Sequence, residues 1–195
     1  MVENRLLDAD DSVLVVVDVQ ERFLGKLPHA ESALLIERIR WLVGVARWAQ
    51  IPRIFTAEDT ATNGPVHPSL ADVLDADTPC FDKRHFALSG QVDIMRAVRS
   101  TGRQTAVLVG LETDVCVSQS AIGLVEQGYR AAVVADAVGS PGPDHAYGLQ
   151  RMRAAGIVVV GLKGLFYEWM RTVARSEQFH AECDDVIPTP SGVRL

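Results

Sequence analysis

Residues 106–128 read AVLVGLETDVCVSQSAIGLVEQG. The apolar, β-branched run at 106–110 predicts a buried strand, and from Val115 onward the apolar residues recur at helical spacing up to a stop at Gly128. Cys116 therefore falls in the first turn of the predicted helix, where free backbone N–H groups and the helix dipole stabilise anions. Such a position lowers the pKa of a thiol and indicates a reactive cysteine. The alternative is a small, buried hydrophobic side chain, which is how most free cysteines behave.

Apolar runs alternate with helical patterns along the rest of the chain, which is typical of a parallel sheet covered by helices on both faces. We expect strands at 12–17, 51–56, 79–82, 105–110, 129–135 and 157–161. Besides the helix of Cys116, we expect helices at 30–50, 91–100, 144–155 and 165–175. The segment 57–77 contains Pro and Gly and is predicted to be looser, and the tail from Cys183 onward to be irregular.

Composition limits both the domain organisation and the possible partners. The chain has 195 residues, is 48% hydrophobic and contains no linker-like stretch, so we expect a single domain over 1–195. A net charge of −6 with scattered arginines argues against nucleic acid as a partner. The acidic N-terminus, the odd count of three cysteines and the lack of a long apolar run predict a cytoplasmic protein without a membrane partner.

Three polar residues follow predicted strands, at the edge where parallel sheets gather their catalytic groups. They are Asp18, Lys83 and Cys116. Asp18 ends the most apolar run, and its alternative role is an Asx turn or a helix cap. Lys83 is one of three lysines in a chain that otherwise uses arginine, which favours a role for a compact point charge, and its alternative is a solvated loop residue.

Four segments together resemble one known family. They are VVVDVQERF, FDKRHF, VGLETDVCVSQSAIGLVEQGYRAAVVADAVGS and LQRMRAAGI. Over nearly the whole chain the sequence resembles the isochorismatase-like cysteine hydrolases, and most closely their metal-independent branch. The resemblance implies an α/β/α sandwich with a six-stranded parallel sheet and a catalytic triad of Asp18, Lys83 and Cys116. It also implies a cis peptide between Leu111 and Glu112, with the N–H groups of Glu112 and Cys116 as an oxyanion hole.

The chemistry implied by the resemblance needs no metal. A Cys116 thiolate attacks the carbonyl carbon of a small amide, imide or related acyl compound, and a thioester forms and is then hydrolysed. Asp18 carries the proton from the thiol to the leaving group, and Lys83 stays charged. Two other functions remain open: hydrolysis of a vinyl ether, as in true isochorismatases, and a non-catalytic binding or scaffold protein. A dinucleotide-binding or flavodoxin-like module is disfavoured because the phosphate-binding loops are absent.

The sequence departs from the metal-dependent nicotinamidases of the same family. Their D-x-H motif corresponds here to residues 58–61, which contain no histidine. His67 and His85 have no second histidine at metal-ligand spacing, so we expect no metal and no cofactor.

The walls of the substrate site are predicted less directly. We expect the small-molecule substrate to contact Gln20, Phe23, His85, Phe86 and Trp169. An ordinary core position is the alternative for the aromatic residues, and it is favoured for Phe86 and Trp169. Members of the resembled family assemble as dimers, tetramers or larger, so the resemblance also implies a homo-oligomer, as a dimer or a tetramer.

Overall fold

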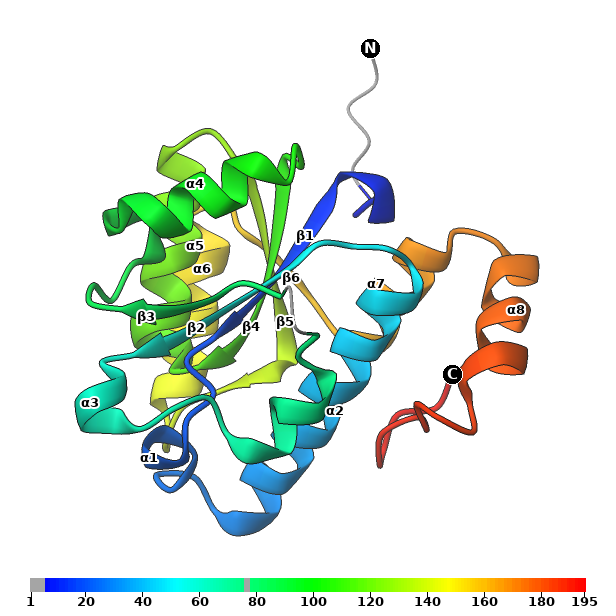
Figure 1. Cartoon of the computed structure of the whole chain (residues 1–195), viewed down its shortest axis with the longest axis horizontal. Helices are drawn as coiled ribbons and strands as arrows, with labels where there is room; N and C mark the ends of the chain where they lie inside the picture. Colours follow the sequence, from blue (N-terminus) through cyan, green and yellow to red (C-terminus); the bar gives the residue numbers. More distant parts are fainter. Residues whose placement is uncertain (1–5, 76–77) are drawn as a thin grey trace.

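A computed structural model describes residues 6–75 and 78–195 and contains one six-stranded parallel sheet (Figure 1). The strands are β1 (Ser12–Val17), β2 (Arg53–Glu58), β3 (Cys80–Lys83), β4 (Thr105–Leu111), β5 (Arg130–Gly139) and β6 (Val158–Val160). Their order across the sheet is β3-β2-β1-β4-β5-β6. The first residues of the predicted acidic N-terminus and the end of the predicted loose segment, 76–77, lie outside the described residues. The predicted α/β/α sandwich is confirmed.

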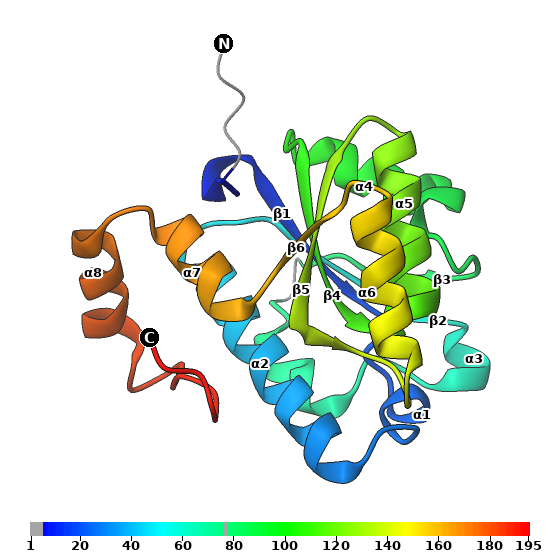
Figure 2. The same cartoon turned by 180° about the vertical axis from the view of Figure 1, so that it is seen from behind.

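Helices cover both faces of the sheet, which explains why the strands are apolar without alternation (Figures 1 and 2). One face packs against α2 (His29–Trp48) and α7 (Leu162–Met170), and α8 (Val173–Cys183) packs on these two helices from outside (Figure 1). The other face packs against α4 (Val92–Ser100), α5 (Ser118–Glu126) and α6 (Asp144–Ala154). Every residue of β1 is buried, so this strand lies at the centre of both cores.

Several predicted elements differ from the structure. The strand expected at 129–135 is β5, which extends four residues further, to Gly139. The single helix expected at 165–175 is two helices, because Arg171 has a φ of 65° and Thr172 caps α8 by accepting a hydrogen bond from the backbone N–H of Arg175. The strand expected at 51–56 begins and ends two residues later, after Pro52. Its last residue is therefore Glu58, at the carboxyl edge of the sheet.

Short elements follow the strands at this edge. α1 (Glu21–Leu24) comes after β1, and α3 (Thr60–Asn63) comes after β2 (Figure 1). Two 3₁₀ turns, η2 (Pro68–Val73) and η3 (Leu88–Gly90), flank β3 in the sequence, and a third, η1 (Ala9–Asp11), precedes β1. The predicted loose segment 57–77 thus contains α3 and η2, and the predicted irregular tail is confirmed after α8.

The carboxyl ends of β1 and β4 approach each other closely. Val17 pairs with Gly110, which has a φ of 116°, and a Cβ added to Gly110 would overlap the carbonyl oxygen of Val17. Only glycine fits this backbone and this contact. Asp18 follows with a φ of 48°, a left-handed conformation that Asp tolerates better than most residues. The two central strands are therefore fixed against each other immediately before Asp18 and Glu112.

Cys116 does not lie in the first turn of a regular α-helix, as the sequence predicts. It belongs to a π-helical turn, η4 (Thr113–Val117), that precedes α5. The N–H of Val117 bonds to the carbonyl of Glu112 over 3.1 Å, which is the wide spacing of a π turn. Gly148 of α6 packs on this turn so tightly that a Cβ there would lie 2.7 Å from the backbone nitrogen of Asp114.

Candidate active site

A buried ion pair forms the base of the site. Lys83 Nζ lies 2.9 Å from Asp18 Oδ2, and both side chains are fully buried. The other Asp18 oxygen, Oδ1, accepts a 2.7 Å hydrogen bond from the Thr56 hydroxyl. Within the described residues, Asp18 Oδ2 has the ion pair but no well-aligned hydrogen bond. This oxygen therefore keeps a lone pair for a proton.

The same ammonium group also reaches the cysteine. Lys83 Nζ lies 3.6 Å from Cys116 Sγ and donates hydrogen bonds to the backbone carbonyls of His85 at 2.7 Å and Phe86 at 3.2 Å. These contacts hold the lysine between the ends of β1 and β4. Asp18, Lys83 and Cys116, which come from three separate parts of the sequence, are therefore brought together.

Glu58, which the sequence does not single out as a site residue, is a fourth member of this group. Its Oε2 accepts a hydrogen bond from Cys116 Sγ at 3.0 Å and lies 3.7 Å from Lys83 Nζ. Its backbone is held by Gln20, whose amide accepts from the Glu58 N–H at 2.7 Å and donates to the Glu58 carbonyl at 3.0 Å. The only sequence signal for Glu58 is that it opens the segment 58–61, which corresponds to the absent metal motif.

The resting site favours a neutral thiol. Burial raises the pKa of Cys116, the negative charge of Asp18 raises it further, and Lys83 offsets these effects only in part. The lowered thiol pKa expected from the sequence is therefore wrong for this state. Burial likewise raises the pKa of Asp18, against the opposing effects of Lys83 and Thr56. Burial by itself lowers the pKa of Lys83, but the neighbouring charges, Asp18 first, outweigh it and raise that pKa.

The expected cis peptide is present between Leu111 and Glu112, directly before the turn of Cys116. The Glu112 carboxylate forms a 2.9 Å ion pair with Lys26, whose ammonium also lies 5.0 Å from the centre of the Phe23 ring. Phe23 is nearly buried and therefore sits beside the loop that carries Glu112. Its expected place near the site is consistent with these contacts.

The structure places two of the other predicted contact residues away from a substrate. Trp169 belongs to α7 and is buried in the core, which is the alternative that the sequence favours for it. Its indole donates a hydrogen bond to the hydroxyl of Ser12, at the start of β1 and thus at the opposite end of the strand from Asp18. Gln20 is fully buried, and its amide is occupied by the backbones of Glu58 and Gly64, so it positions Glu58 and has no group left for a substrate.

His85 and Phe86 lie close to the site through their backbones. Both carbonyls accept hydrogen bonds from Lys83. Phe86 is 55% exposed, so it is not the core residue that the sequence favours. The His85 side chain is exposed and lies against Gly90, where an added Cβ would be 3.1 Å from the ring.

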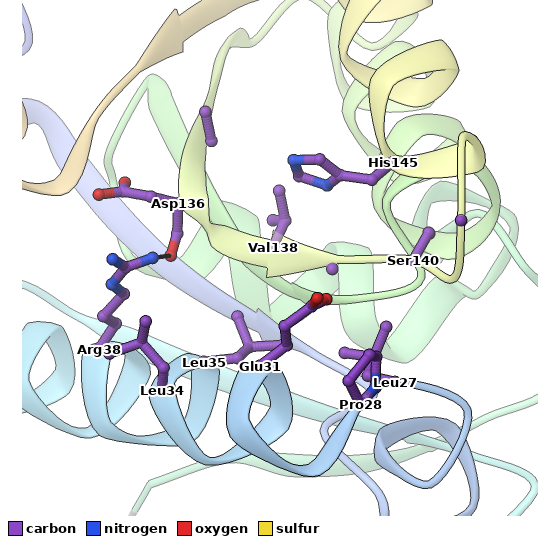
Figure 3. A pocket seen from close by; sticks show the side chains of 13 residues that line it. Leu27, Pro28, Glu31, Leu34, Leu35, Arg38, Asp136, Val138, Ser140 and His145 are labelled. Carbon is purple, nitrogen blue, oxygen red and sulfur yellow. Dashed lines mark hydrogen bonds between the residues drawn. The ribbon is translucent and has the colours of Figure 1, made fainter.

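A cavity of about 540 Å³ lies on the other side of the cysteine turn, between α2 and the end of β5 (Figure 3). Arg38 projects into it from α2 and donates to the Asp136 carbonyl, while His145 faces it from the start of α6. The cavity borders the π-helical turn of Cys116, because His145 Nδ1 lies 3.0 Å from the hydroxyl of Thr113 in that turn. None of its lining residues belongs to the group around Lys83.

Metal binding can be tested against the same atoms. Asp18, Glu58 and Cys116 each bring one ligand atom within 4.8 Å of the others, which is close enough for a shared cation. Lys83 Nζ already contacts all three, at 2.9, 3.7 and 3.6 Å respectively. A metal ion among these ligands would face a buried positive charge at short range, so the residues do not fit a metal site.

Comparison with known proteins identifies the family of this chain. The Isochorismatase domain family matches residues 12–163, which include Asp18, Glu58, Lys83 and Cys116. The chain belongs to the isochorismatase family. The family and its relatives are hydrolases, so the isochorismatase-like hydrolase fold expected from the sequence is confirmed.

Two similar proteins carry the name YcaC, one from Escherichia coli and one from Pseudomonas aeruginosa. "Probable hydrolase YcaC" of Escherichia coli is 30% identical over 141 residues, which cover 69% of this chain and 65% of that protein, just under two thirds of its length. The structure of YcaC from Pseudomonas aeruginosa with hexane-2,5-diol and covalent acrylamide has a TM-score of 0.83 at 25% identity, covering 93% and 91% of the two chains. The Escherichia coli YcaC structure, described as an octameric hydrolase of unknown specificity, has the same TM-score and identity over 95% and 94%.

Membrane insertion has no structural support in the described part of this isochorismatase-family chain. Over residues 6–75 and 78–195, no helix combines the length and the apolar character needed to cross a bilayer.

Proposed function

We propose that this isochorismatase-family hydrolase is a cysteine hydrolase that cleaves the C–N bond of a small amide, imide or related acyl compound through a thioester. The observation that carries the proposal is the position of Lys83 Nζ, 2.9 Å from Asp18 Oδ2 and 3.6 Å from Cys116 Sγ. A buried ion pair is a poor source of stability, because removing two charges from water costs about as much as their attraction returns. Its position beside a buried thiol supports a chemical role.

The first half of the reaction forms the thioester. As Cys116 Sγ attacks the carbonyl carbon, its proton moves to Asp18, whose raised pKa makes it a better base than an ordinary carboxylate. The N–H groups of Glu112 and Cys116 hold the negative oxygen of the tetrahedral intermediate. Collapse of the intermediate breaks the C–N bond, and Asp18 gives its proton to the departing amine or ammonia.

The second half restores the enzyme. Asp18 takes a proton from a water molecule, and the resulting hydroxide attacks the thioester carbon. The C–S bond breaks, the carboxylic acid leaves, and Asp18 returns the proton to the Cys116 sulfur. Lys83 keeps its charge throughout, since its pKa is raised, and it stabilises the sulfur anion each time that it forms.

A covalent adduct in a relative supports a nucleophile in this family. The Pseudomonas aeruginosa YcaC structure contains covalent acrylamide. Acrylamide alkylates nucleophiles through its alkene carbon, so the adduct supports nucleophilic chemistry and does not bear on the bond that is cleaved.

We also propose that this chain forms a homo-oligomer, because the Escherichia coli YcaC structure is described as octameric. We further propose a cytoplasmic location, which the three free cysteines favour.

A direct screen tests the proposal. Small carboxamides, imides and carbamoyl compounds are incubated with the protein, and released ammonia is measured. We expect ammonia release with at least one class and none with Cys116→Ala. Cleavage of a vinyl ether with no dependence on Cys116 would favour the isochorismatase reaction. Binding without turnover of any compound, in wild type and variant alike, would favour a scaffold protein.

A further inference from the structure

Carboxyl groups outnumber ammonium groups around the sulfur. Asp18 and Glu58 supply two carboxylates, Lys83 supplies one ammonium, and the resting thiol is neutral. The next basic residue in the sequence, Arg84, pairs with Asp82 at 2.8 Å and with Asp59 at 2.7 Å. Two carboxyl groups and one ammonium group thus lie around the sulfur.

Glu58 is the member of this group that faces the approach to the sulfur. Its side chain is 17% exposed, whereas the side chains of Asp18 and Lys83 are fully buried. Its backbone is fixed by Gln20, and Asn63 donates to its carbonyl at 3.0 Å, so the carboxylate extends from a rigid base. Glu58 is therefore the charged side chain of this group that is most accessible to a bound molecule.

The distance to the sulfur places Glu58 beside the reacting atoms. Its Oε2 lies 3.0 Å from Cys116 Sγ. A carbon under attack lies about 3 to 3.5 Å from the nucleophile, so a substituent on that carbon comes within hydrogen-bond reach of Oε2. An ionised carboxylate only accepts hydrogen bonds. It therefore favours an N–H group or a cation at this place and repels a carboxylate.

This inference rests on the proposed function and narrows its substrate. We infer that Glu58 is a specificity-determining residue, which selects acyl compounds with an N–H group on the reacting carbonyl, such as primary amides and ureido compounds. Compounds with a carboxylate beside that carbonyl are rejected. On binding, the substrate N–H replaces the Cys116 S–H as the hydrogen-bond donor to Glu58, which frees the thiol proton for transfer to Asp18.

Two alkylating reagents of the same size and leaving group test the inference. Iodoacetamide carries an amide and iodoacetate a carboxylate, so the ratio of their rates measures the preference for an N–H group over a negative charge. Rates are measured at one pH by peptide mass spectrometry, and the exposed Cys80 of the same chain gives the reference ratio. The thiolate fraction cancels in each ratio, so a change in the pKa of Cys116 does not affect the result.

We expect the amide-to-carboxylate ratio at Cys116 to exceed that at Cys80 by about tenfold or more, because a unit charge lies close to the reacting carbon. In Glu58→Gln the ratio falls to within about threefold of that at Cys80. The high wild-type ratio should be retained in Glu58→Asp, which keeps the charge. It should also be retained in the control variant Glu126→Gln, which removes one charge from the exposed end of α5. If a Glu58 variant fails to fold, the comparison of the wild-type ratios at Cys116 and Cys80 still tests the inference.

The outcomes separate this inference from the proposed function. Equal ratios at Cys116 and Cys80 in the wild type, or an unchanged ratio in folded Glu58→Gln, overturn the role of Glu58 and leave the cysteine mechanism intact. Failure of both reagents to modify Cys116, together with no loss of amide hydrolysis in Cys116→Ala, overturns the proposed function and with it the selection by Glu58.

Discussion

Lys83 Nζ and Asp18 Oδ2 form a 2.9 Å ion pair in which neither side chain is exposed to solvent. The pair connects the end of β3 to the end of β1 and holds Lys83 within 3.6 Å of the Cys116 sulfur. Its geometry leads to predictions about stability as well as about catalysis.

Loss of one partner of the pair should destabilise the fold. Lys83→Met leaves Asp18 buried without its counter-charge, and such changes cost about 3 to 5 kcal/mol in the free energy of unfolding. The double variant Asp18→Asn/Lys83→Met should recover part of this loss, because no unpaired charge remains. Urea denaturation of the three proteins measures both effects. Equal stability of wild type and Lys83→Met would show that the pair is not buried as described.

The raised pKa values of Cys116 and Lys83 predict a loss of stability in alkaline solution. Above pH 9.0, the ordinary pKa of the thiol, the unfolded chain releases this proton while the folded protein keeps it. The unfolded state then binds fewer protons, so stability falls as pH rises, by up to about 1.4 kcal/mol per pH unit for each such group. Above 10.5, Lys83 adds to the loss. Urea denaturation at pH 8 to 10 should show a steeper decline for wild type than for Cys116→Ala.

Activity should survive removal of metal ions, because Lys83 occupies the centre of the group formed by Asp18, Glu58 and Cys116. Once a substrate is found, its hydrolysis is measured after exhaustive chelation and again after zinc is added back. We expect the same rate in both samples as in untreated protein. Loss on chelation with recovery in zinc would mean that the ammonium is displaced by a metal.

Gly110 should tolerate no side chain. Gly110→Ala places a Cβ against the Val17 carbonyl at a φ of 116°, so we expect a loss of several kcal/mol or failure to fold. Gly102 offers a matched control, since it also has a positive φ, of 70°, but open space around its Cβ. Gly102→Ala should cost only about 1 kcal/mol. Similar losses in the two variants would contradict the close approach of β1 and β4.

Much of the fold could be predicted from the sequence because parallel strands buried on both faces are apolar throughout. β1 and β4 are such runs, and their predicted and observed bounds agree within one residue. Boundaries set by single backbone conformations were missed: the break at Arg171 depends on one left-handed residue, and the start of β2 depends on the turn at Gln50 and Pro52.

The site was predictable only in part, because some of its contacts join residues that lie far apart in the sequence. Asp18, Lys83 and Cys116 follow strands within recognisable motifs, whereas Glu58 lies at the end of a strand with no motif of its own. Its importance comes from a 3.0 Å contact across 58 positions of sequence, which no local pattern encodes. The raised pKa of Cys116 was missed for the same reason, since it arises from burial and from the charge of Asp18, not from the turn that carries the thiol.

The central claim is that Cys116 forms a thioester which Asp18 then helps to hydrolyse, and p-nitrophenyl acetate as acyl donor tests it most directly. Rapid quenching and peptide mass spectrometry should find one acetyl group on Cys116 in the wild type and none at this position in Cys116→Ala. In Asp18→Asn the acetyl group, once formed, should persist, because no base activates water. Acetyl groups spread over lysines, with equal amounts in wild type and Cys116→Ala, would contradict the account.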